Sequence, residues 1–357
     1  MTWKEDQIKN EIQIMKQLDH PNICKLHDYY YEPNFIYIVM EILNGGDLLD
    51  ENRSELKYNS EQEISKIMKQ ILSALNYLHL KKICHRDIKS ENILYKSENS
   101  DIVKLIDFGS ATEFSQNIKM SEVVGTAYYM APEVINGSYT EKCDIWACGV
   151  LMNILLTGLP PYNGDSEEEI LEKIKKGGYD PNQNCVLESI SLQAKSLLSK
   201  MLQSDYMQRP SAAECLNDEW INNCQIKIDL SKYNKQARFI TNYKQKNMIE
   251  VIATKYLISH FTLDEEIEEL RNLFEEIDSD KSGTIQKEEM INFLQKMYPM
   301  KNDIKNDVEN IFYEVDLDGS GTVEYSEFVT MFVKRKQLIS EEMLKKTFAS
   351  LDLVIIS

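Results

Sequence analysis

The chain has 357 residues, of which 43% are hydrophobic, so it is long enough for two or three domains with buried cores. Its formal net charge of -18 argues against a nucleic-acid-binding surface as its main function and is compatible with cations or basic peptides as partners. The cysteines are scattered without a Cys-x-x-Cys pair, a pattern typical of free thiols in a reducing compartment.

A helix and a hairpin are predicted in the first part of the chain. Apolar residues from Ile8 to Leu18 recur at helical spacing and predict a helix over residues 6–18. Residues 23–29 and 35–42 are rich in Ile, Tyr and Val, which predicts two strands.

A long and mostly helical region follows, from about residue 60 to residue 221. Ser60-x-x-Glu63 is a capping box that opens a long amphipathic helix. A loop-rich stretch over 83–133 interrupts the helical pattern. Near residue 222 the composition changes to basic residues interspersed among apolar ones, and after residue 262 the chain becomes acidic.

The loop-rich stretch carries three ordered motifs. His85-Arg86-Asp87 is followed at the right spacing by Asn92, then by Asp107-Phe108-Gly109, and Ala131-Pro132-Glu133 closes the segment. Phosphoryl transfer requires an aligned nucleophile, metal ions on the phosphates and positive charge against the developing negative charge. One such motif is weak on its own, but three in this order indicate phosphoryl transfer.

In these motifs the chain resembles the eukaryotic protein kinase family over roughly residues 1–221. The resemblance implies that Asp87 accepts the proton of the substrate hydroxyl and that Lys89 steadies the transferring phosphate. It implies that Asn92 and Asp107 hold Mg²⁺ beside ATP. Lys89 and Thr126 resemble the serine/threonine pattern among kinases.

Further positions follow from the same resemblance. Glu11 occupies the place of the glutamate that pairs with the phosphate-binding lysine. Met40 and Glu41 resemble the gatekeeper and the start of the hinge, and Leu94 is assigned to the nucleotide site with them. Asp144 resembles the buried aspartate that holds the catalytic loop from below. Glu133 and Arg209 are expected to form a buried ion pair, and His85 and Phe108 to pack in the core.

Two acidic positions bear on the protein substrate. Asp47 and Glu91 fall where basophilic kinases place carboxylates against a substrate arginine, and a guanidinium pairs well with such groups. The alternative is that both are ordinary surface acids. In the activation segment, Glu122 stands where many kinases carry a phosphothreonine that pairs with the catalytic-loop arginine, here Arg86. Phosphorylation of this segment is therefore not expected to be the main switch.

The residues that precede Glu11 hold no Gly-rich loop and no strand lysine, both of which kinases normally carry there. We therefore expect the sequence to be truncated at its start, and the activity of this chain itself is left open. The alternative is a catalytically impaired, kinase-like calcium-sensing protein or fragment.

Two stretches match the 12-residue EF-hand loop, which supplies oxygen ligands to Ca²⁺ and has a glycine at its sharp turn. Ile285 and Val323, at the same loop position, are expected to pair as a short strand. A third loop begins at Asp352 without further ligands. We expect affinities of about 10⁻⁷–10⁻⁵ M. The candidate Ca²⁺ ligands are Asp278, Asp280, Ser282, Thr284 and Glu289 in the first loop, and Asp316, Asp318, Ser320, Thr322 and Glu327 in the second.

A kinase region, a basic amphipathic junction and EF-hands, in this order, resemble the calcium-dependent protein kinase family. The resemblance implies that the junction is autoinhibitory and that calcium-loaded EF-hands capture it. A passive linker is the alternative for the junction, and a calmodulin-regulated kinase without its own sensor is disfavoured by two complete loops. The expected partners are ATP and protein substrates with basic residues near Ser or Thr. The expected location is the cytoplasm, without a transmembrane segment, and membrane targeting by a missing N-terminus is the alternative.

The fold class expected is α+β: a protein-kinase-like fold with an incomplete N-lobe and a largely helical C-lobe, followed by an all-α EF-hand pair. The expected divisions are a remnant of the N-lobe over 1–44, the C-lobe over 45–221, the junction over 222–261, the EF-hand pair over 262–336 and an incomplete third hand over 337–357.

Overall fold

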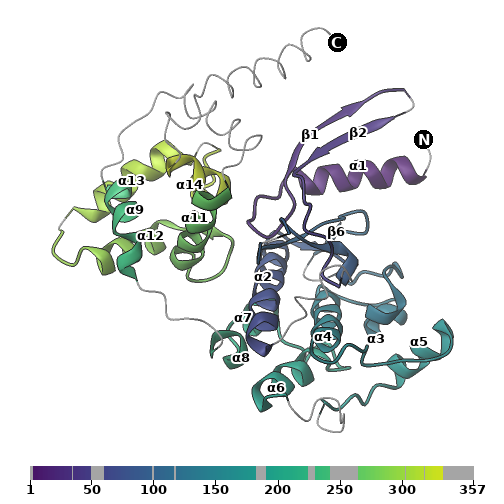
Figure 1. Ribbon diagram of the computed structural model, residues 1–357. Helices are drawn as coiled ribbons and strands as arrows, with labels where there is room; N and C mark the ends of the chain where they lie inside the picture. The colour runs from purple at the N-terminus through teal and green to yellow at the C-terminus, as the bar shows by residue number, and fades with distance from the viewer. Residues whose placement is uncertain are drawn as a thin grey trace. The chain divides into compact units, whose positions relative to one another are not determined.

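The computed structural model divides into two compact units, Met1–Lys227 and Ile228–Ser357, and Figure 1 shows the ribbon. Each unit has its own hydrophobic core. The structure describes residues 3–33, 35–49, 60–98, 100–115, 118–181, 190–223, 230–241, 264–301, 303–316 and 318–332.

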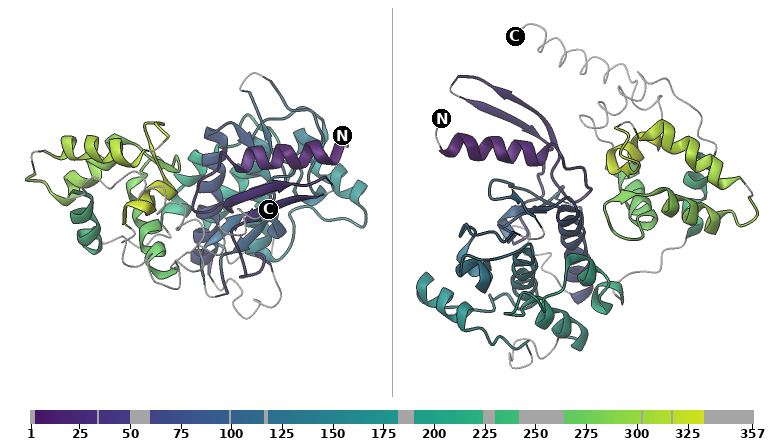
Figure 2. Two further views of the ribbon diagram at one scale, coloured as in Figure 1. Left: turned by 90° about the horizontal axis from the view of Figure 1, so that it is seen from above. Right: turned by 180° about the vertical axis from the view of Figure 1, so that it is seen from behind.

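The first unit begins with a helix that lies beside a hairpin (Figure 2). Helix α1 spans Trp3–Met15, and the antiparallel strands β1 and β2 span Leu26–Tyr31 and Ile36–Met40. The helix and both strands predicted from the sequence are thus present, with boundaries shifted by a few residues. The buried face of α1 includes Ile12 and Met15, which recur at helical spacing.

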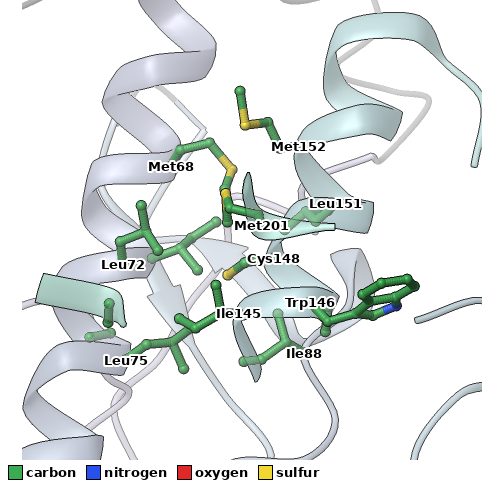
Figure 3. Close-up of a cluster of buried hydrophobic side chains, with 14 of the residues drawn as sticks. Met68, Leu72, Leu75, Ile88, Ile145, Trp146, Cys148, Leu151, Met152 and Met201 are labelled. Carbon is green, nitrogen blue, oxygen red and sulfur yellow. The ribbon is translucent and has the colours of Figure 1, made fainter. Parts of the chain in front are cut away.

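Two helices form the centre of this unit. Helix α2 (Glu61–Leu80) begins at the predicted N-cap, where the Ser60 side chain accepts a hydrogen bond from the Glu63 amide. Helix α4 (Lys142–Thr157) is apolar on nearly all sides and is buried accordingly. The side chains that pack between α2 and α4, with their neighbours, are drawn in Figure 3 and include Met68, Leu72, Leu75, Ile145, Cys148 and Met201.

Short elements surround this centre and form the loop-rich stretch expected over 83–133. Strand β3 (Ile83–Cys84) pairs with β6 (Thr112–Glu113), and β4 (Ile93–Tyr95) pairs with β5 (Val103–Leu105). Because both pairs are short, the segments between them remain loops.

The remaining elements described in the first unit are η2 (Ser90–Asn92), η3 (Ala127–Tyr129), α3 (Pro132–Ile135), α5 (Glu167–Lys176), α6 (Leu192–Met201), α7 (Ala212–Leu216) and α8 (Glu219–Asn223).

The cysteines that the structure describes, all in the first unit, are free and buried. Burial raises the pKa of the Cys24 thiol to about 11 and that of the Cys215 thiol to about 12. Cys84 and Cys143 lie with their sulfurs 3.6 Å apart, beneath the loop that follows β3. These thiols behave as small apolar core groups, as the absence of a Cys-x-x-Cys pair predicted.

The second unit contains two helix–loop–helix segments. These are α11 (Asp264–Ile277) with α12 (Lys287–Met297), and α13 (Ile304–Val315) with α14 (Tyr325–Phe332). Between them, β7 (Thr284–Ile285) pairs antiparallel with β8 (Val323–Glu324), and Ile285 lies opposite Val323 as predicted. An α+β kinase-like unit and an EF-hand pair therefore match the predicted fold class.

A short helical segment of the predicted junction belongs to this second unit. Turn η6 (Leu230–Tyr233) leads into α9 (Asn234–Thr241), which buries Ala237 and Ile240 against the EF-hand core. The rest of the junction, over 224–229 and 242–261, and the third hand over 337–357 lie outside the described residues. In the part of the chain that is described, no helix combines the length and apolar character needed to cross a membrane.

Candidate functional site

A buried carboxylate supports the loop that carries the first motif. Asp144, in the first turn of α4, accepts hydrogen bonds from the backbone amides of His85 and Arg86 at 3.0 and 2.8 Å and contacts His79 Nε2 at 2.9 Å. Arg86 has a φ of 68°, a conformation that side chains other than glycine rarely adopt. Asp144 thus holds a strained turn from below, as the resemblance implied.

Asp87 is the centre of a compact polar cluster. Its carboxylate lies 2.7 Å from Lys89 Nζ and accepts a hydrogen bond from Thr126 Oγ1 at 3.1 Å. Asn92 Nδ2 donates to the same carboxylate at 3.0 Å and to the Asp87 carbonyl at 2.9 Å. The structure therefore brings together four of the five residues predicted to be catalytic, from the catalytic loop and from the activation segment.

The fifth, Asp107, lies within electrostatic reach of this cluster. Burial opposes the charge of Lys89, but the hydrogen bond and charge of Asp87, together with the charges of Glu91 and Asp107, raise the pKa of Lys89. Asp107 has a φ of 62° and accepts a hydrogen bond from the Gly109 amide at 3.1 Å. Its carboxylate thus interacts with the charge of Lys89 in the cluster around Asp87.

Glu11 of α1 lies against the same segment. Burial first, and then the negative charge of Asp107, raise the pKa of the Glu11 carboxyl, while a hydrogen bond from the Phe108 backbone lowers it. Two carboxylates that face each other in this way favour a cation between or beside them. Helix α1 and the Asp107-Phe108-Gly109 motif, which is predicted to bind metal, are therefore in contact.

The other residues predicted to bind the nucleotide lie in strands or directly after them. Met40 ends β2 and is 46% exposed, and Leu94 lies in β4 opposite Lys104 of β5. The Glu41 carboxylate accepts a hydrogen bond from Lys104 Nζ at 2.8 Å. Sequence reasoning missed Lys104 because nothing in the motif spacing pairs it with a residue in another strand.

The two predicted substrate carboxylates both lie next to β4, Asp47 through a bridge to Leu94 and Glu91 in the turn before the strand. Asp47 pairs with Leu94 in an isolated bridge and accepts the Leu49 amide at 2.9 Å. Glu91 lies in η2 and accepts a hydrogen bond from Ser90 Oγ at 2.8 Å. Both are therefore adjacent to the strand that follows the catalytic loop, and their role in binding a substrate stays a prediction. Sequence reasoning missed the Ser90 contact.

The activation segment meets the catalytic loop at Arg86. Its Nη1 lies 3.1 Å from a Glu122 carboxylate oxygen, so the predicted pair is present. The same Nη1 donates to the hydroxyl of Tyr139 at 3.2 Å, and Nε donates to the Ser110 carbonyl at 2.6 Å. Tyr139 was not predicted, and no motif in the sequence marks it.

The predicted structural contacts are also present. Arg209 donates to both carboxylate oxygens of Glu133, at 2.5 and 3.1 Å, and both side chains are buried. The rings of His85 and Phe108 meet edge to face, with centroids 5.0 Å apart, and neither residue is exposed. These four residues hold the site together without facing a substrate.

Both EF-hand loops gather carboxylates. Asp278, Asp280 and Glu289 place ligand oxygens within 4.8 Å of one another, and the second loop does the same. Ser282 Oγ and the Thr284 carbonyl, both predicted ligands, lie 3.0 Å apart. This set of hard oxygen donors fits Ca²⁺.

In the first loop, bringing the carboxylates close together has an electrostatic cost. Burial, opposed by a hydrogen bond from the Gly283 amide and reinforced by the charge of Glu289, raises the pKa of Asp278 to about 7. Gly283 and Gly321 have φ values of 80° and 81°, which glycine adopts without strain. The loops are thus shaped for a cation by their backbone as well as by their charge. The corresponding groups in the second loop are Asp316, Asp318, Ser320, Thr322 and Glu327.

Comparison with known proteins gives matches over both units. The protein kinase domain model matches residues 1–221, and the EF-hand domain pair model matches residues 267–333. Calcium-dependent protein kinase 4 of Plasmodium falciparum (isolate 3D7) is 38% identical over 98% of this chain and 68% of its own length. Its counterpart from Plasmodium berghei (strain Anka) is 37% identical over 96% and 67%. Calcium-dependent protein kinase 5 of Plasmodium berghei is 43% identical over 69% and 42%.

Proposed function

This chain belongs to the calcium-dependent protein kinase family and is a calcium-activated serine/threonine protein kinase, and from that premise we propose how its residues act. The observation that carries the proposal is the cluster around Asp87, which joins a carboxylate, an ammonium and a hydroxyl within hydrogen-bond distance. Each of these groups has a distinct part in phosphoryl transfer.

Asp87 accepts the proton of the substrate hydroxyl as that oxygen bonds to the γ-phosphorus of ATP and the bond to the β,γ-bridging oxygen breaks, which releases ADP. Lys89 remains protonated, since its pKa is raised, and offsets the negative charge on the transferring phosphate. Thr126 fixes the Asp87 carboxylate. Mg²⁺ would be held by Asn92 and Asp107, where it would neutralise phosphate charge.

We assign the nucleotide to the region between α1 and the hinge. Glu11 lies beside the Asp107 segment, and Met40 and Glu41 end the hairpin near Leu94. The ion pair between Glu41 and Lys104 fixes this hinge to β5. The side chain of Glu41 is therefore occupied by the protein, and it would act on the nucleotide through its backbone.

A preference for basic protein substrates follows from charge. Asp47 bridges to Leu94 of β4, and Glu91 lies next to Asn92 of the Asp87 cluster, in the turn before the same strand. A substrate arginine would pair with them through its planar guanidinium, which suits carboxylates better than an ammonium does. The supporting feature is that both carboxylates accept hydrogen bonds from local donors and so are held in place.

For regulation, the EF-hand ligands named above would bind Ca²⁺ and the junction over 222–261 would restrain the kinase when calcium is low. The proposed divisions at 44, 221, 261 and 336 follow the sequence, and the two units divide at Lys227. The fixed charge of Glu122 on Arg86 would make phosphorylation of the activation segment dispensable. The cytoplasm is the proposed location.

The test is transfer of labelled phosphate from ATP to a serine peptide with an arginine nearby, with calcium and with a chelator. We expect calcium-dependent labelling that Asp87→Asn lowers by about 10²–10⁴-fold, the range for loss of a general base. An Asp205→Asn variant, altered on the surface away from the cluster, should match the parent. Labelling that persists in Asp87→Asn would show that Asp87 is not the base.

A further inference from the structure

The activation segment is tied to the catalytic loop by a buried tyrosine as well as by the Arg86–Glu122 ion pair. Tyr139 lies after α3, and its backbone pairs with Met120 of the activation segment through two hydrogen bonds of 2.9 and 3.0 Å. Its side chain is fully buried. Its hydroxyl donates to the Glu122 carbonyl at 2.6 Å and accepts from Arg86 Nη1 at 3.2 Å.

The ion pair alone is a weak tether. The Glu122 side chain is 55% exposed, whereas that of Arg86 is only 9% exposed. Ion pairs with an exposed partner contribute little to stability, because water screens the attraction and ordering the side chains costs entropy. Something else must therefore keep the Glu122 backbone in reach of Arg86.

Tyr139 supplies what the ion pair lacks. Its hydroxyl is shielded from water, so its hydrogen bond to the Glu122 carbonyl does not compete with solvent. Because that bond is made to the backbone, it holds the segment in place regardless of the conformation of the Glu122 side chain. Burial raises the pKa of the Tyr139 hydroxyl, so it remains a proton donor at neutral pH, while Arg86 opposes that shift.

We propose that Tyr139 is a positioning residue: its buried hydroxyl anchors the Glu122 backbone beside Arg86, so that the activation segment is held in place without a phosphate. The inference rests on the proposed function of Arg86 and Glu122. It adds a residue that touches neither substrate nor nucleotide. Tyr139 acts through Arg86, which is adjacent in sequence to the base Asp87.

The direct test is amide hydrogen exchange of residues 118–126 in the full chain. Tyr139→Phe keeps the ring and removes the hydroxyl, and we expect exchange in this stretch to rise about 3- to 10-fold, the range for one net hydrogen bond. Glu122→Gln should raise it less, by about 1- to 5-fold, as for an exposed pair. Tyr206→Phe is the matched control, because its ring contact with Lys119 needs no hydroxyl, and it should leave exchange unchanged.

Kinetics separate positioning from a general loss of structure. In Tyr139→Phe we expect kcat to fall as exchange rises, while the KM for ATP stays constant, since the Tyr139 hydroxyl bonds to Arg86 and Glu122. In the double variant with Glu122→Gln the two effects should be less than additive. An inactive parent would count against the proposed function, yet exchange would still decide the inference.

Two results would overturn it. One is unchanged exchange over 118–126 in Tyr139→Phe while the variant remains folded. The other is loss of all protection in Glu122→Gln with Tyr139 intact, which would make the exposed ion pair the main tether. The second result can be obtained even if Tyr139→Phe does not fold.

Discussion

Asp144 illustrates how one buried charge holds a catalytic loop. Burial disfavours its charged form, but the hydrogen bond and charge of His79 and the backbone amide of His85 outweigh that cost and lower the pKa of Asp144. A group with a lowered pKa stabilises the folded state above its unfolded pKa, and the gain is lost as the pH falls through the folded value. The charged form of Asp144 is therefore part of the fold at neutral pH.

We predict that Asp144→Asn lowers the free energy of unfolding of the first unit by about 3 kcal/mol at pH 7, as expected when one member of a buried, paired network is removed. The difference should be the same at pH 5 and should shrink only as the pH falls below the ordinary Asp value of 3.8. Urea unfolding of both proteins at several pH values measures it. Asp101→Asn, at an exposed position, is the control.

The residues of the site were predictable to different degrees. Asp87, Lys89 and Asn92 lie in one motif whose spacing is fixed by a short loop, so the sequence alone identified them. Lys104 and Tyr139 could not be found in that way. Each bonds to a partner in a distant segment, Glu41 or Glu122, and only the folded backbone brings those segments together.

At the scale of elements, α9 shows that a segment assigned to the junction from the sequence can pack into the core of the neighbouring unit. Its eight residues are too few for a helix that is stable in water, so its structure depends on the core that it contacts. Ala237 and Ile240 are fully buried there, and the Phe239 ring contacts that of Phe332 of α14 in a tilted arrangement with ring centroids 5.3 Å apart. A basic segment that the sequence assigned to the junction is thus partly a component of the EF-hand core.

We predict that Ile240→Ala destabilises the second unit by about 2–4 kcal/mol, the range for truncating a buried isoleucine. Lys235→Ala on the same helix is exposed and should change stability by less than about 0.5 kcal/mol. Chemical unfolding followed by helix signal, together with amide exchange over 234–241, measures both. Equal effects of the two substitutions would mean that α9 does not depend on this contact.

The element boundaries follow from the same physics. The N-cap Ser60 marks the start of α2, and the apolar spacing identified α1 although its ends shifted by up to three residues (6–18 against 3–15). Helix ends are set by local competition between caps and packing, which spacing does not report. Short strands such as β3 and β6 gave no periodic signal, because two residues cannot show alternation.

The whole molecule has two units, each with its own core, and the candidate ATP and Ca²⁺ sites lie in different units. A ligand that binds only the folded state stabilises it by mass action, about 4 kcal/mol at a concentration 1,000 times its dissociation constant. With the affinities expected above, about 1 mM calcium is about 10²–10⁴ times the dissociation constant of each loop. Since the candidate ligands all lie in the second unit, calcium should act on that unit.

We predict two calorimetric transitions, of which calcium shifts one upward by several degrees. The double variant Glu289→Gln and Glu327→Gln, which removes the last carboxylate of each loop, should abolish that shift. Asp87→Asn should retain it, because Asp87 belongs to the first unit. A shift that survives the double variant would place the responsible calcium sites elsewhere in the chain.

The buried thiols of the first unit can be used to measure how often that unit unfolds. Cys24, Cys84, Cys143, Cys148 and Cys215 are all shielded, and raised pKa values keep them protonated, so alkylating dyes should not react at these five described positions while the unit is folded. The rate of labelling at these positions would therefore report local or global unfolding that exposes the thiols. A cysteine introduced at the surface would then carry a probe without competition from these five.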